Sequence, residues 1–197
     1  MPATACASGA PRRCYPQALP LRMPFAYYAR LTTTQQRTYR DSDSRTELAL
    51  PTGVAPASAV LALRAALEQD DRAAVRRHCQ AITTALTTGY GVPPVRIEVL
   101  AQRPSDDYGE LHGLYDPRED TPPAQVTLWM RTAALGRVVA FRSFVRTLVH
   151  ELCHHLDYEL YKLAETFHTE GFYKRESSLA NALFTAAGIP PPPKKRL

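Results

Sequence analysis

Two histidines and a glutamate in the C-terminal half of the chain have the types and the spacing that bind a metal ion. The stretch His150-Glu151-Leu152-Cys153-His154 reads H-E-x-x-H. Two imidazoles four residues apart lie on one face of a helix and can bind the same ion. A glutamate beside the first of them can reach a water on that ion and act as its general base. The stretch therefore indicates metal-assisted hydrolysis.

The residues around this motif predict the helix that it needs. Apolar side chains recur from Val138 onward at intervals of three or four residues, with one double turn, as on a buried helix face. They are Phe141, Val145, Leu148, Leu152, Leu156 and Leu163. His150 and His154 lie on a neighbouring face, and four of the six histidines fall between positions 150 and 168. We interpret the pair as metal ligands rather than as surface histidines on a helix that continues to about Leu163.

A third ligand must come from another segment. A catalytic zinc usually has three protein ligands and one position open to water. The segment from 165 to 176 holds three residues that can supply it: His168, Glu170 and Glu176. His168 and Glu176 are about two helical turns apart if the helix that follows begins early, so we do not expect both to bind one ion.

The placement of His168 resembles that in the SprT-like (Spartan-type) metallopeptidases. His168 lies fourteen residues past His154, before Gly171 and a second helical pattern. In that family a lone histidine opens the helix after H-E-x-x-H, and a phenylalanine follows a few residues later, as Phe172 does here. The signature is confined to residues 150–172, and the likeness of architecture covers about residues 95–187. The resemblance implies a zinc metalloendopeptidase with one Zn²⁺ per chain, bound by His150, His154 and His168.

Two other zincin patterns match less well. In metzincins a glycine and a third histidine follow the second histidine, but Asp157 and Leu160 occupy those positions here. Glu176 would match the third-ligand glutamate of gluzincins, and residues 176–181 weakly resemble the minimal members of that group. We favour His168 over Glu176 as the third ligand, with Glu170 third.

The predicted fold is α+β and zincin-like, with a small, mostly antiparallel sheet packed on the H-E-x-x-H helix and extra N-terminal helices. Residues 94–100, 109–116 and 124–131 have strand patterns, and residues 116–123 form a polar turn. The second and third strands are expected to pair as an antiparallel hairpin, which leaves one edge free to receive an extended peptide. His112 is expected to be a strand residue rather than a ligand.

The rest of the chain divides into four parts. Residues 1–22 are expected to be a disordered extension, residues 23–92 a helical segment packed on the core, residues 93–188 the zincin-like core and residues 189–197 a Pro/Lys-rich tail. Residues 32–43, 56–69 and 71–88 are the expected N-terminal helices, the last one capped by Asp71 and ended by Gly89. His78 on that helix is expected to be structural or exposed.

Composition limits the compartment and the partners. The four cysteines show no C-x-x-C spacing, no signal peptide or membrane span is recognised, and a cytoplasmic location follows as the expectation. The formal charge of +5 comes partly from basic residues near the two ends. Some SprT-like proteases act on proteins attached to DNA, but no motif in this chain supports a nucleic-acid partner. The expected partner is a protein or peptide substrate, and the oligomeric state stays open.

The residues suggest a division of roles. Glu151 is expected to be the general base, and the oxyanion needs a donor for which His155, Tyr173 and Arg175 are candidates. Asp157 either orients a ligand histidine or is a plain helix-surface residue. The alternative function is a zinc-binding regulatory protein with little or no turnover. The presence of Glu151 argues against that alternative, because a structural zinc site does not need a general base.

Overall fold

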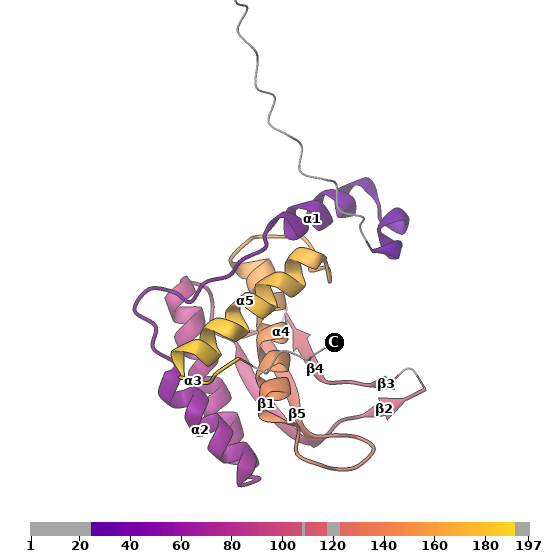
Figure 1. Cartoon of the computed structure of the whole chain (residues 1–197). Helices are drawn as coiled ribbons and strands as arrows, with labels where there is room; N and C mark the ends of the chain where they lie inside the picture. The colour runs from indigo at the N-terminus through magenta and orange to yellow at the C-terminus, as the bar shows by residue number, and fades with distance from the viewer. Residues whose placement is uncertain (1–24, 108, 118–122, 192–197) are drawn as a thin grey trace, which may run out of the picture.

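The computed structural model describes residues 25–107, 109–117 and 123–191, and Figure 1 shows how its elements are arranged. The predicted extension over residues 1–22 and residues 192–197 of the predicted tail lie outside these ranges. The helices are η1 (Ala26–Arg30), α1 (Thr33–Ser44), α2 (Ala57–Glu68), α3 (Arg72–Tyr90), α4 (Phe141–Glu159) and α5 (Glu170–Ala186). The strands are β1 (Arg96–Gln102), β2 (Ser105–Asp106), β3 (Gly109–Glu110), β4 (Gly113–Asp116) and β5 (Gln125–Arg131).

The N-terminal helices begin at side chains that cap them. Thr32 and Gln35 form a capping box at the start of α1, and Asp71 accepts a hydrogen bond from the amide of Ala74 at the start of α3. The predicted end of α3 at Gly89 is wrong. The helix continues to Tyr90 and ends at Gly91, whose φ of 67° lies in the left-handed region that glycine adopts without strain.

The sheet is mixed, and the prediction of a mostly antiparallel sheet is corrected here. Its strand order is β1-β5-β4. β4 pairs with β5 in antiparallel fashion, as predicted, but β1 pairs with β5 in parallel over the longer ladder. The predicted strand over residues 109–116 is divided into β3 and β4, and β3 forms a separate small hairpin with β2.

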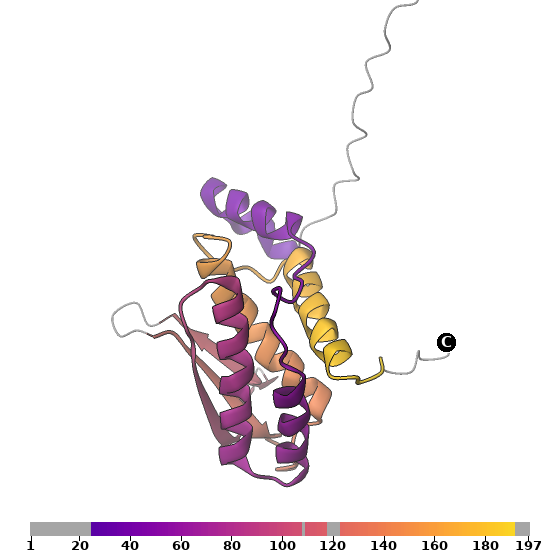
Figure 2. The same cartoon turned by 90° about the vertical axis from the view of Figure 1, so that its left-hand side faces the viewer.

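The two edges of this sheet are covered differently. At the β1 edge, the side chain of Gln80 from α3 accepts a hydrogen bond from the amide of Ile97 and donates one to the carbonyl of Val95, both at 2.9 Å. Figure 2 shows α3 lying along this side of the molecule. The β4 edge instead faces the cleft described below.

One hydrophobic core joins the helical segment to the sheet. Most of its buried apolar residues come from α2, α3, β1, β5, α4 and α5, and they extend along the sequence from Leu48 to Phe184. α4 lies across the sheet, and α5 crosses α4 on the side away from the strands (Figure 1). The helical segment and the predicted core thus share their buried surface. Among the described residues, no helix has the length and apolar character to cross a membrane.

α4 is shorter than predicted. It ends at Glu159, and Lys162 has a φ of 54°, a left-handed conformation that a helix cannot contain. Leu163 still fits the apolar pattern because the chain turns back and buries this side chain, which is 6% exposed. The shorter helix frees residues 160–169 to form a loop between α4 and α5. We call these residues the ligand loop, since His168 lies in it.

Candidate metal centre

The two motif histidines come from the same face of α4 and rest on one aromatic ring. Phe172 of α5 is fully buried, and its ring centroid lies 5.0 Å from that of His150 and 4.7 Å from that of His154. The apolar stripe of α4 packs into the core, and this packing fixes the direction of the neighbouring face. Helix geometry and Phe172 together aim both imidazoles to the same side.

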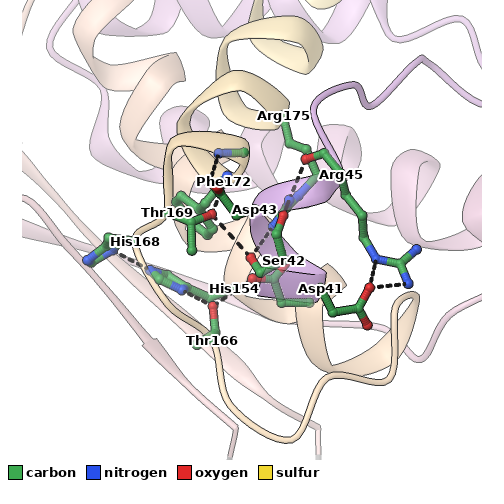
Figure 3. Close-up of polar contacts among 12 residues, drawn as sticks. Asp41, Ser42, Asp43, Arg45, His154, Thr166, His168, Thr169, Phe172 and Arg175 are labelled. Atoms are coloured by element: carbon green, nitrogen blue, oxygen red, sulfur yellow. Dashed lines mark hydrogen bonds and ion pairs between the residues drawn. The ribbon is translucent and has the colours of Figure 1, made fainter. Parts of the chain in front are cut away.

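The third imidazole approaches from the ligand loop. The Nε2 atom of His168 lies 3.0 Å from Nε2 of His150 and 3.1 Å from Nε2 of His154, and Figure 3 shows His168 and His154 facing each other. Three nitrogens at bonding distance from one tetrahedral zinc lie about 3.3 Å apart. The spacing therefore fits one ion with small outward shifts. Among the described residues, these three histidines form the group whose ligand atoms converge in this way.

The partners of the Nδ1 atoms direct the other ring nitrogens of His150 and His154 toward Nε2 of His168. Nδ1 of His150 donates to Oε2 of Glu176 at 3.1 Å. Nδ1 of His154 lies 2.8 Å from Oγ1 of Thr166, whose hydroxyl donates to Asp157 at 2.9 Å and therefore accepts from the histidine. Each of these two imidazoles then carries its proton on Nδ1 and a lone pair on Nε2. Both lone pairs are directed at Nε2 of His168, which can donate a proton to only one of them at a time. A cation between the three nitrogens would satisfy them all, so this donor set fits a metal ion.

The surroundings of His154 and His168 also keep these two imidazoles neutral, which is the form that binds metal. Burial and the neighbouring His150 and His168 lower the pKa of His154 to about 3. Burial and the neighbouring His150 likewise lower the pKa of His168. Neither group therefore needs to lose a proton at neutral pH before it can bind a metal ion.

Glu151 lies beside these ligands, against the edge of the sheet. It is 6% exposed, and burial raises its pKa to about 7, although His150 and the backbone amide of Tyr115 act in the opposite direction. Gly113 allows β4 to lie this close to α4. Any other residue would place a Cβ atom where it overlaps the Glu151 carboxylate. The carboxylate thus lies between the histidines and strand β4.

A cleft of about 800 Å³ opens onto the three histidines and Glu151. One wall consists of residues 110–115 from β3 and β4, together with Pro117. The other wall is the face of α4 that carries the ligands, from Ser143 to Tyr158. An extended chain lying along β4 would therefore pass directly over the site.

The structure separates the remaining candidates. Glu176 contacts Nδ1 of His150 rather than the space near the Nε2 atoms. It is therefore placed to orient His150 and not to be the third ligand. Glu170 pairs with Lys174 one turn along α5. Asp157 is fully buried and reaches His154 through Thr166, so it is not a helix-surface residue.

Two of the three candidates for the oxyanion donor are buried in other contacts. His155 is buried and donates from Nε2 to the carbonyl of Pro93, while its Nδ1 faces the hydroxyl of Tyr115. Arg175 is fully buried in an ion pair with Asp157. Tyr173 remains, because it is 42% exposed and its ring stacks on that of His168 with centroids 5.8 Å apart.

The other two histidines play no part in the centre. His78 is half-buried on α3, and His112 is an exposed residue between β3 and β4 that lines the cleft. Sequence reasoning missed Gly113 and Thr166. A glycine inside a strand pattern signals close approach of another group, so Gly113 could have been noticed. Thr166 carried no such signal, because its contact depends on the course of an irregular loop.

Comparisons of this chain with protein-family models, with curated proteins and with solved structures found no match. The interpretation of the site therefore depends on its own geometry.

Proposed function

We propose that this protein is a zinc-dependent metallopeptidase that binds one Zn²⁺ per chain through His150, His154 and His168. The observation that carries the proposal is the convergence of three imidazole Nε2 atoms beside a buried carboxylate. A site that only stabilises the fold has no use for Glu151, whereas a hydrolase needs a base at this position.

When bound, a zinc ion supplies Lewis-acid chemistry, because it lowers the pKa of water and polarises a carbonyl group. Glu151 takes a proton from the attacking water and passes it to the nitrogen of the leaving amine. Glu176 and Thr166 hold the rings of His150 and His154 through their Nδ1 atoms. Tyr173 is the remaining candidate for stabilising the oxyanion, because its ring stacks on that of His168, although it does not line the cleft.

The substrate is proposed to be an extended segment of protein that pairs with β4. This strand lies at the edge of the sheet, so one row of its backbone groups faces the cleft. The amide of Tyr115 in this strand contacts the Glu151 carboxylate. A peptide added at this edge would therefore bring its backbone next to the base. The exposed side chain of Leu114, also on β4, suits an apolar residue in the substrate.

The decisive experiment compares the parent protein with Glu151→Gln and Glu159→Gln after loading with zinc. Glu159 lies on the same helix, pairs with the exposed Lys162 and does not line the cleft, so it is the matched control. Cleavage of an unfolded protein such as casein is followed by the release of amino groups, and zinc is measured in the same samples.

We expect the parent and Glu159→Gln to cleave casein, to stop when a chelator removes zinc and to recover when zinc returns. Glu151→Gln should keep its zinc and lose activity by about 10²–10⁴-fold, the usual contribution of a general base. A parent that binds zinc and cleaves nothing would favour a binding protein without turnover. A parent without zinc would end the proposal altogether.

A cytoplasmic location remains part of this proposal. The two cysteines that the structure describes, Cys79 and Cys153, are buried free thiols, and a reducing compartment preserves thiols.

A further inference from the structure

The ligand loop that carries His168 contains no helix or strand of its own. Ordering an irregular segment costs conformational entropy, and a metal ligand on such a segment keeps its place only if other groups hold the backbone. The helix that presents His150 and His154 does not extend into this loop. Contacts from elsewhere in the chain must therefore position His168.

The first described residues of the chain supply such contacts. We call residues 25–45 the N-terminal arm; they contain η1 and α1. The hydroxyl of Tyr27 donates a hydrogen bond of 3.1 Å to the carbonyl oxygen of His168 itself. Gln35 donates from Nε2 to the carboxylate of Glu165 at 3.1 Å. The arm thus contacts a side chain of the ligand loop and the backbone carbonyl of His168.

The C-terminal end of the arm contacts the junction between the ligand loop and α5 (Figure 3). Oδ1 of Asp43 accepts a hydrogen bond of 2.9 Å from the amide of Gly171 in the first turn of α5. Gly171 is required there, because a Cβ atom would overlap the carbonyl oxygen of Asp43. Ser42 lies with its Oγ 3.4 Å from Oγ1 of Thr169, the residue that caps α5 and directly follows His168.

A buried arginine connects the arm to the second motif histidine. Arg175 donates to the carbonyl oxygens of Ser42 and Arg45, both at 2.6 Å, at the end of α1. It also donates to Asp157 at 2.7 Å. Asp157 accepts from Thr166, which orients His154. The end of α1 is therefore joined to both the ligand loop and a ligand on α4.

We propose that the N-terminal arm is a positioning element of the metal centre, which holds His168 where it can complete the three-histidine site. The inference rests on the proposed function for its metal. It goes further by assigning a role to a segment more than one hundred positions away from the motif. Tyr27 is the most suitable single residue for a test, because its hydroxyl bonds His168 directly and its side chain is itself exposed.

A neighbouring tyrosine provides a matched control. Tyr28 packs on the ring of Tyr39 as Tyr27 does, with centroid distances of 5.0 and 5.9 Å. The hydroxyl of Tyr28 is buried and has no hydrogen-bond partner among the described residues. Tyr27→Phe and Tyr28→Phe therefore remove the same atom from the same arm, and only the first removes a bond to His168.

The experiment compares the full-length parent with these two variants. Zinc affinity is measured by competition with a coloured chelator, and the coordination of the ion by the visible spectrum of bound Co²⁺. Hydrogen–deuterium exchange of residues 160–169 is measured in the metal-free proteins, and thermal unfolding is followed in parallel. For Tyr27→Phe we expect about tenfold weaker zinc binding, at the lower end of the range for residues that orient ligands. We also expect a changed Co²⁺ spectrum and faster exchange, with Tyr28→Phe like the parent.

Three outcomes would overturn the inference. In the first, Tyr27→Phe has the same zinc affinity, the same Co²⁺ spectrum and the same exchange as the parent. In the second, Tyr27→Phe only melts at a lower temperature, with an unchanged spectrum and unchanged exchange. The third is equal change in both variants. If the parent binds no zinc, the proposed function fails by itself. Exchange in the metal-free proteins then still decides whether the arm holds the ligand loop.

Discussion

The two halves of the proposed metal centre are built in different ways. His150, Glu151 and His154 lie within five residues of one helix, and the periodicity of that helix alone places them on a common side. His168 comes from a loop, where its carbonyl oxygen contacts Tyr27 of the arm and the next residue, Thr169, contacts Ser42 and caps α5. The helix half is local, whereas the loop half is a product of tertiary structure. The loop half is therefore the one that distant substitutions should disturb.

The largest expected effect is on the folding stability of the protein, when the buried ion pair beneath the loop half is broken. Asp157 and Arg175 form an ion pair in which both side chains are fully buried. Asp157→Ala leaves a buried guanidinium without its carboxylate, which costs about 3–5 kcal/mol of folding free energy. For a chain of this size the melting temperature should fall by roughly 6–20 °C.

Asp41→Ala is the control for this experiment, because it breaks an exposed ion pair with Arg45 worth at most about 1 kcal/mol. Chemical denaturation of both metal-free variants measures the difference. Equal destabilisation by the two variants would show that the buried pair does not support this half of the centre.

The next effect in size tests the ligands themselves. His154→Ala removes a ligand from the helix half and His168→Ala one from the loop half. Each ligand contributes about 3 kcal/mol to a typical zinc site, so each variant should bind zinc roughly 100–1000-fold more weakly. Titration against a chelator measures both affinities.

The two variants should differ in one respect. Both rings contact Phe172, but His168 is the more exposed of the two, so His154→Ala should destabilise the metal-free protein more than His168→Ala does. Full zinc affinity in His168→Ala would remove the loop half from the centre.

A smaller effect is expected when the link between the halves is cut. Thr166 belongs to the ligand loop but bonds Nδ1 of His154, a ligand of the helix half. Thr166→Val should lower zinc affinity about 10–100-fold, as is usual when a ligand loses its orienting partner. Thr84→Val changes an exposed threonine on α3 far from the centre and should leave the affinity unchanged. An unchanged Thr166→Val protein would mean that the helix half needs no help from the loop.

The same division explains what the sequence could predict. The helix half was predicted down to its residues because a 3.6-residue pattern needs only neighbouring positions. The antiparallel pairing of β4 with β5 was also predictable, since the two strands follow each other closely along the chain. The candidate His168 came from a family resemblance rather than from periodicity, and the contacts that hold it come from a segment more than one hundred positions away.

The errors have physical causes of the same kind. α4 was predicted to continue to Leu163 because an apolar residue fits the pattern whether it lies in a helix or in a turn that folds back. The parallel pairing of β1 was missed because a connection through β2, β3 and β4 separates it from β5. His155 and Arg175 could be named as candidates for the oxyanion donor because the sequence does not show that polar side chains near a motif face the core when buried partners satisfy them.

The smallest expected effect is the one that tests the division into a helix half and a loop half most directly. In Glu176→Gln the amide oxygen can still accept the hydrogen bond from Nδ1 of His150, so only the charge of the acceptor is lost. A hydrogen bond to a charged group is stronger than a neutral one by about 1 kcal/mol, so zinc affinity should fall roughly fivefold. If Glu176 were itself the third ligand, the same substitution would remove a bonding carboxylate and affinity would collapse by two or more powers of ten. Because His168→Ala would then be nearly silent, measuring both affinities decides whether the third ligand belongs to the loop or to α5.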